Sequence, residues 1–189
     1  MDQDDSSEKL PPLREAREIA SRCLVLYAVC AAGHKQSRSL LREWLQRERL
    51  WTHASPEERA LFEASELSDR DGIQATWRIE AVVPLLWALG HLRDLPRPTA
   101  LCDVPAIQAL LPTIGAATGG FVEAAQLRSE VEIWEGLEAT YQAHWQVNDA
   151  RYHGKQIPGG LNPGAIRERH LGLNWLTGNV EWDEVTTDT

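Results

Sequence analysis

The chain has 189 residues, of which 43% are hydrophobic and 25% charged, a composition typical of one globular domain with a well-developed core. Its formal net charge of −9 argues against binding to a nucleic-acid backbone, because such proteins need basic patches. No apolar run reaches the roughly 18 residues needed to cross a bilayer, and the acidic N-terminus is unlike a secretory or transit signal. We therefore expect a cytoplasmic protein with no nucleic-acid or membrane partner.

The first twelve residues are polar and acidic, so we expect residues 1–12 to form a disordered tail with nothing to bury. From there the pattern predicts a single helical domain over residues 13–189. Between Ile19 and Cys30, apolar residues recur every three or four positions, which is typical of one face of a helix. Gly33 is expected to end this first helix.

Two helix starts follow in the N-terminal half. Ser37 is expected to cap a second helix that turns Trp44 inward. The segment Ser55–Glu58 then combines a capping serine, a proline in the first turn and two early acidic residues, which is a strong start signal. This third helix is expected to end near Ala64.

Residues 73–92 are apolar on all sides, so we expect a central helix buried in the middle of the domain. Pro84 lies inside this helix and lacks an amide hydrogen, which frees the backbone carbonyl of Glu80 four residues earlier. The sequence therefore predicts a kink, or a compensating donor, at Glu80.

The C-terminal half continues the helical pattern. A short helix is expected over residues 103–112 and a longer one over 121–134, with a continuation over 137–148 after a break near Gly136. A last helix should run over residues 162–178, from an asparagine-proline cap to a glycine.

The final segment is acidic, but Trp182 and Val185 suggest that it docks on the domain. No useful stretch of alternating apolar and polar residues occurs anywhere in the chain. The sequence therefore predicts an all-α protein with about seven or eight helices.

Several of the eight tryptophans lie beside charged or polar residues inside apolar runs. A buried polar group costs several kcal/mol unless it has partners. We therefore predict an internal polar network, which is either a functional site or a structural lock. Its members are Arg78, Glu80, His144, Arg169, His170, Asn174 and Asp183.

Sequence signatures of catalysis are weak. The chain has no GxSxG elbow, no phosphate-binding loop and no histidine pair with metal-ligand spacing. The three cysteines are expected to be reduced thiols, with Cys23 and Cys30 inert in the core. We therefore predict no catalytic residue, no cofactor and no metal, although a site assembled from His144, His170 and Asp183 is geometrically conceivable.

The carboxylates beside aromatic residues allow two interpretations. Burial can raise the pKa of a carboxyl group into the range useful for acid-base catalysis. Alternatively, nearby arginines pair with these carboxylates. The presence of arginines close to them in the sequence favours this second interpretation, because buried charge persists when it is paired. The carboxylates are Glu80, Glu168 and Asp183, and the arginines are Arg78, Arg167 and Arg169.

Four motifs together resemble a bacterial family catalogued only as a domain of unknown function. They are WRIEAVVPLLWALG at 77–90, SPEERALF at 55–62, ERHLGLNWL at 168–176 and EWDEVTTDT at 181–189. The resemblance extends from about Leu13 to Thr189, so it covers nearly the whole chain. It implies a compact, mostly helical single domain and supplies no activity, cofactor or catalytic residue.

The function expected first is a non-enzymatic, acidic protein-binding module, in particular an immunity-type protein that neutralises a basic bacterial toxin. A second hypothesis is an enzyme of unrecognised type that uses Arg78, Glu80, Arg169, His170 and Asp183. It requires these side chains to converge on a pocket open to solvent. A third hypothesis is a scaffolding protein that self-associates through an exposed helix face.

Overall fold

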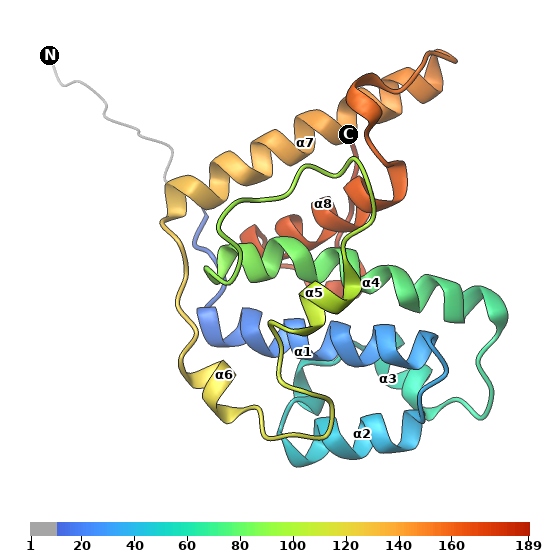
Figure 1. Cartoon of the computed structure of the whole chain (residues 1–189), viewed down its shortest axis with the longest axis vertical. Helices are drawn as coiled ribbons and strands as arrows, with labels where there is room; N and C mark the ends of the chain where they lie inside the picture. The colour runs from blue at the N-terminus through green and yellow to red at the C-terminus, as the bar shows by residue number, and fades with distance from the viewer. Residues whose placement is uncertain (1–10) are drawn as a thin grey trace, which may run out of the picture.

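The computed structural model describes residues 11–189, in which all regular secondary structure is helical (Figure 1). The predicted all-α class is therefore confirmed. Of the predicted N-terminal tail, residues 1–10 lie outside the described part, and Pro11 and Pro12 are exposed and non-helical. The described residues form eight α-helices: α1 (Ala16–Gly33), α2 (Arg38–Arg47), α3 (Pro56–Glu63), α4 (Asp69–Ala88), α5 (Val104–Gln108), α6 (Gly119–Glu123), α7 (Glu130–Tyr152) and α8 (Pro163–Thr177). Three short 3-10 helices accompany them: η1 (Trp51–His53), η2 (Pro158–Gly160) and η3 (Trp182–Glu184).

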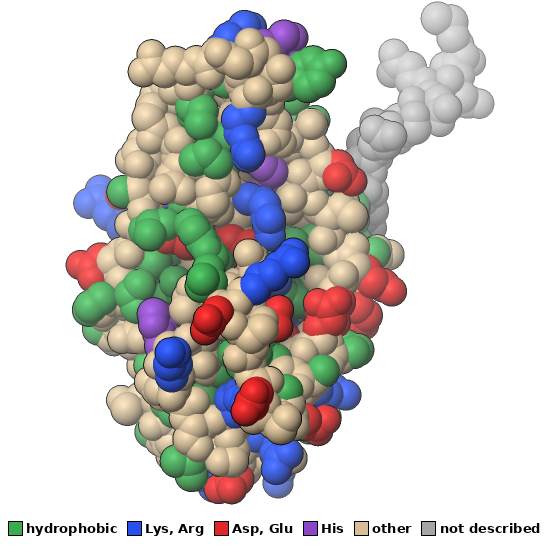
Figure 2. All heavy atoms as spheres, turned by 90° about the vertical axis from the view of Figure 1, so that its right-hand side faces the viewer, with side chains coloured by type: hydrophobic (Ala, Val, Ile, Leu, Met, Phe, Trp, Pro, Cys, Tyr) green, Lys and Arg blue, Asp and Glu red, His purple; other side chains and the backbone are tan. Residues whose placement is uncertain are grey.

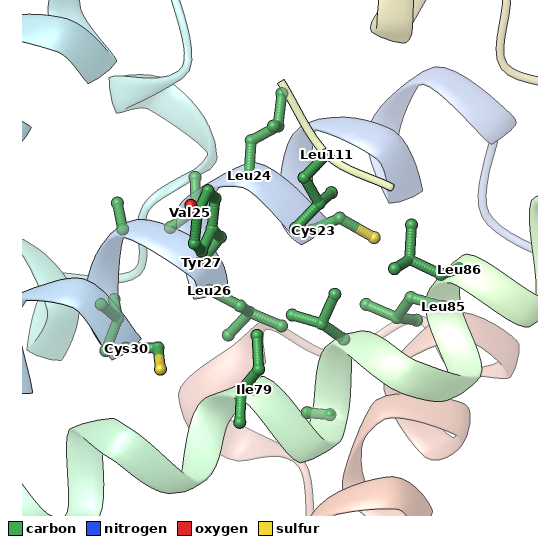
Figure 3. Close-up of a cluster of buried hydrophobic side chains, with 14 of the residues drawn as sticks. Cys23, Leu24, Val25, Leu26, Tyr27, Cys30, Ile79, Leu85, Leu86 and Leu111 are labelled. Atoms are coloured by element: carbon green, nitrogen blue, oxygen red, sulfur yellow. The ribbon is translucent and has the colours of Figure 1, made fainter. Parts of the chain in front are cut away.

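Helix α4 lies at the centre of the molecule, packed between α1 and α8 (Figure 1). Residues 79–88 of α4 are all buried, and so is every residue of α1 from Ile19 to Ala32. In Figure 3, Cys23 of α1 points toward Leu86 of α4, and Leu26 lies near Ile79. The core is therefore built on two helices, α1, buried from Ile19 to Ala32, and the predicted central helix α4, buried from Ile79 to Ala88.

The boundaries of α4 differ from the prediction, because the helix begins at Asp69 and ends at Ala88. The Ser68 side chain caps the start by accepting the backbone N–H of Asp71 at 3.1 Å. The helix ends just before Gly90, whose φ of 79° suits glycine. A kink or a compensating donor was predicted at Glu80, and α4 continues through both Glu80 and Pro84.

The predicted continuous run over residues 121–134 and the break near Gly136 are both wrong. Helix α6 ends at Glu123, and α7 begins only at Glu130, where Ser129 forms a capping box. Helix α7 then passes through Gly136 without interruption. A Cβ atom at Gly136 would lie 2.5 Å from the ring of Trp87, so this glycine permits close helix packing rather than a chain break.

The remaining helices cover the two central ones. Helices α2, α3 and α6 pack against α1, whereas α7 packs along the outer side of α8 (Figure 1). Two glycines of α8 allow it to approach α4 closely: a Cβ at Gly164 would meet Trp77 at 2.5 Å, and one at Gly172 would meet the carbonyl oxygen of Ala81 at 2.8 Å. Helix α8 thus lies between α4 and α7, where the predicted polar residues gather.

Candidate functional site

Glu80 and Arg169 form a buried ion pair between α4 and α8. Nε of Arg169 donates to one Glu80 oxygen at 3.0 Å, and Nη2 forms an ion pair with the same oxygen at 2.8 Å. Nη1 donates to the carbonyl oxygen of Pro96 at 2.8 Å. The other Glu80 oxygen accepts the backbone N–H of Cys102 at 2.6 Å. Each polar atom of the two charged groups has a partner, which is the condition under which buried charge is tolerated. The pair therefore attaches the connecting segment of residues 96–102 to both α4 and α8.

Arg78 and Glu168 form a second pair between the same helices, nearer the surface. Nη1 of Arg78 donates to Glu168 at 2.7 Å, and Arg167 donates to the other carboxylate oxygen at 3.2 Å. The Glu168 side chain is 3% exposed, whereas those of Arg78 and Arg167 are 25% and 55% exposed. A buried carboxylate is thus held by two arginines that solvent can reach.

His144 and His170 meet on the other side of α8, where it packs against α7. Their Nδ1 atoms lie 3.0 Å apart, and Nε2 of His144 lies 3.4 Å from the side-chain nitrogen of Asn148. Burial lowers the pKa of both rings, and the neighbouring His144 contributes to lowering the pKa of His170 to about 4. Both imidazoles are therefore neutral near pH 7, with one N–H shared between the two Nδ1 atoms.

The C-terminal segment docks beside this histidine pair. The side-chain nitrogen of Asn174 donates to the carbonyl oxygen of Thr186 at 2.8 Å, and that of Asn148 donates to the Thr189 hydroxyl at 2.6 Å. Trp182 of η3 is buried, and its ring lies 5.8 Å from that of Trp175 in α8, edge to face. The segment is thus held by α7 and α8 together.

Asp183, which the sequence places in the internal network, is exposed instead. One of its carboxylate oxygens accepts the backbone N–H of Glu57 at 3.0 Å, in the first turn of α3. A carboxylate at this position satisfies an unpaired helix donor and interacts favourably with the helix dipole. Asp183 therefore braces the start of α3 and does not contribute to a buried cluster.

The seven predicted residues are divided among separate contacts rather than joined in one network. The reason is the geometry of α8: successive residues of a helix are rotated by about 100°. Glu168 and Arg169 consequently face α4, and His170 faces α7. Asn174, one turn later, reaches the C-terminal segment.

Sequence reasoning missed a buried ion pair between Arg22 of α1 and Glu58 of α3. Arg22 also donates to the carbonyl oxygen of His53 at 2.8 Å, and its guanidinium group lies 4.2 Å from the ring centre of Trp182. Glu58 at the same time accepts the backbone N–H of Ser55 at 2.9 Å in the capping box. An arginine inside the apolar run of α1 was the available signal, since such a residue needs a buried partner.

Several cavities open near these groups and at the opposite end of α4. A cavity of about 320 Å³ opens between α8 and the C-terminal segment, and one of about 930 Å³ lies where α1 and α3 end and α2 and α4 begin. Both carry charges of both signs. The polar lining of the first includes Glu57, Arg78, Arg167, Asp183 and Asp188, and that of the second includes Lys35, Arg38, Arg42, Glu63 and Asp69. Glu80 and His170 line neither cavity.

The cysteines are held as protonated thiols. Burial raises the pKa of Cys23 and raises that of Cys30 to about 11. Burial, with the Glu80 carboxylate nearby, raises the pKa of Cys102 to about 12. Since the thiolate is the reactive form, these environments disfavour nucleophilic chemistry. Within residues 11–189, no three His, Cys, Asp or Glu side chains are grouped so that they could hold a metal ion.

Comparison with known proteins identifies a family. A family model described as a domain of unknown function, DUF4272, matches residues 5–185, which confirms the resemblance carried by the sequence motifs. No curated protein and no solved structure matches the chain. In the described part of the chain, no helix is both long and apolar enough to span a membrane.

Proposed function

The chain belongs to the DUF4272 family, and we propose that it is a non-enzymatic protein-binding module of the immunity type. Such a protein neutralises a basic bacterial toxin by direct contact, without chemistry of its own. The observation that carries the proposal is the excess of acidic residues, 28 against 19 basic ones.

The buried ion pairs concentrate this charge excess on the outside of the molecule. The Glu80–Arg169 and Arg22–Glu58 pairs each contribute one positive and one negative charge, so they cancel in the interior. The net charge of −9 therefore belongs to the rest of the chain. An acidic exterior attracts a basic protein and speeds their encounter.

The alternative, an enzyme built on Arg78, Glu80, His170 and Asp183, has less support. Arg78 and Asp183 both line the cavity of about 320 Å³, which is the observation in its favour. Glu80 and His170, however, do not line that cavity and are engaged by Arg169 and His144. The four side chains therefore do not converge on one reacting centre.

The proposal is tested by measuring binding between the purified protein and the products of neighbouring toxin-like genes. We expect a complex that forms rapidly at low ionic strength and weakens as salt is added, because exposed charges are screened. Co-expression should also protect cells from the toxin. A matched acidic protein of similar size serves as the control for non-specific attraction. The absence of a stable complex at low ionic strength would contradict the proposal.

The oligomeric state of the protein distinguishes the scaffolding hypothesis from toxin binding. Light scattering of the purified protein distinguishes a monomer from a self-associated form. A stable homo-oligomer that buries the acidic exterior would favour scaffolding over toxin binding, because it would leave less charged surface for a basic partner.

A further inference from the structure

Helix α7 carries a row of aromatic residues on one side, which we call the α7 aromatic stripe. Its members are Trp134, Tyr141, Trp145 and Tyr152. They are spaced by seven, four and seven residues, and these spacings place side chains on nearly the same side of a helix. At 1.5 Å per residue the stripe is roughly 27 Å long.

Three of the four members of the stripe are exposed, and Trp134 is half-buried. The side chains of Trp145 and Tyr152 are 47% and 86% exposed, and Tyr141 is 36% exposed although its ring touches His170 edge to face. Helix α7 makes its main contacts with α8 and η2, and it lies at the periphery of the molecule (Figure 1). Exposed tryptophan and tyrosine residues are the types that most often dominate binding energy at protein interfaces.

The charges around the stripe are mainly acidic. From Glu130 to Tyr152, α7 has five acidic residues and one basic residue, Arg151, in its last turn. Glu130, Glu135 and Glu138 are exposed on α7, whereas Asp149 pairs with Lys155 at 3.6 Å. An apolar row flanked by acidic side chains is complementary to a helix that is apolar on one side and basic beside it.

Other exposed apolar side chains are scattered over different elements and form no comparable row. They are Leu40 on α2, Ile73 on α4, Val131 on α7 outside the row, and Leu101 and Val180 in connecting segments. On the face drawn in Figure 2, basic and acidic side chains are interspersed. Neither arrangement combines an apolar row with the excess of acidic residues found along α7.

We propose that the outer face of α7 is a docking surface for an amphipathic helix of a basic protein, with the α7 aromatic stripe as its apolar anchor. This inference rests on the proposed function and assigns it a surface. A second copy of the chain is a poorer occupant, because pairing two α7 faces would bring their acidic residues together in molecules that each carry a net charge of −9.

The experiment uses the full chain and a fluorescent peptide of about 18 residues, in which lysine and leucine alternate at helical spacing. We expect the basic peptide to bind, as measured by fluorescence anisotropy, and a glutamate-leucine peptide of the same pattern not to bind. The double variant Trp145→Ala/Tyr152→Ala should weaken binding at least about tenfold, since truncation of anchor residues typically costs that much.

Two matched variants separate the apolar and the charged contributions. Leu40→Ala/Ile73→Ala removes exposed apolar side chains elsewhere and should leave the affinity unchanged. Glu130→Gln/Glu135→Gln/Glu138→Gln should weaken binding at low salt and flatten its salt dependence. Failure of the basic peptide to bind, or unchanged affinity in the Trp145→Ala/Tyr152→Ala variant, would overturn the assignment. A dimer that Trp145→Ala dissociates would also overturn it, in favour of a second copy.

The outcomes for surface and function are distinguishable. If the protein neutralises a toxin and the stripe variant does so equally well, the function stands and the surface is wrong. If the stripe binds the basic peptide but no toxin is neutralised, the surface stands and the immunity function is wrong.

Discussion

The two sides of α8 bury polar groups by opposite means. Toward α4, Arg169 and Glu168 form ion pairs with Glu80 and Arg78. Toward α7, His170 meets another histidine and remains neutral. A single helix thus shows that ionised groups are buried where a counter-charge faces them, and that groups without one are buried uncharged. The two sides should respond differently to mutation and to pH.

The largest effect is expected on the charged side. Glu80→Gln leaves Arg169 positively charged and buried without a counter-charge, which should lower the free energy of unfolding by about 3–5 kcal/mol. Urea denaturation followed by circular dichroism measures this change. Glu66→Gln, at an exposed position, is the matched control and should have little effect. If Glu80→Gln lowered the free energy of unfolding by less than about 1 kcal/mol, the proposed difference between the two sides of α8 would be wrong.

On the histidine side, stability should depend on pH. The pKa of His170 is about 4 in the folded protein against 6.5 as the ordinary value. Between these values the unfolded chain binds a proton that the folded protein does not. Stability is therefore full above about pH 6.5 and falls as the pH drops toward 4, by about 3 kcal/mol in total.

Chemical denaturation at a series of pH values measures how the free energy of unfolding depends on pH. His170→Gln should reduce this pH dependence, since one of the two buried histidines whose pKa is lowered is gone. His34→Gln, at an exposed histidine, is the matched control. An unaltered pH dependence in His170→Gln would show that the acid sensitivity originates elsewhere.

A smaller effect is expected for the second ion pair on the charged side. Arg78→Ala should lower the free energy of unfolding by roughly 1–2 kcal/mol, because Glu168 keeps its contact with Arg167. The double variant Arg78→Ala/Arg167→Ala leaves Glu168 buried without an arginine and should cost more than the sum of the single variants. Strict additivity, measured from thermal or urea unfolding, would mean that the two arginines act independently.

The smallest effect on stability is expected away from α8. Trp145→Ala removes a side chain that is 47% exposed on α7, so the free energy of unfolding should change by only about 0.5 kcal/mol. The same urea denaturation experiment measures it. A loss of several kcal/mol would mean that the α7 aromatic stripe is part of the core and is not a surface for a partner.

Much of the fold was predictable from local patterns. The capping serines before α2 and α3 and the apolar runs of α1 and α4 each placed a helix correctly. The glycines were harder to interpret, because a glycine can end a helix or admit a neighbouring ring. Gly33, the last residue of α1, also admits the backbone of α4, where a Cβ would lie 2.6 Å from the carbonyl oxygen of Gly72, and Gly136 admits Trp87. The choice depends on a partner that is distant in the sequence.

The polar residues beside tryptophans were identifiable, but their partners were not. Glu80 meets Arg169 across 89 positions of the chain, and Arg78 meets Glu168 across 90. No local spacing encodes such pairings, since they follow from how α8 packs on α4. Arg22 was missed because it lies in a run otherwise read as apolar, and its partner Glu58 served in the prediction only as an early acidic residue of α3.

The docked segment that contains η3 has a consequence for synthesis. Trp182 covers the Arg22 guanidinium and packs on Trp175, while Asp183 holds the first turn of α3. These contacts join residues from both ends of the chain, and the ribosome delivers the segment only after every helix that it braces. During translation, the contacts of Trp182 and Asp183 can therefore form only after α1, α3 and α8 have been synthesised.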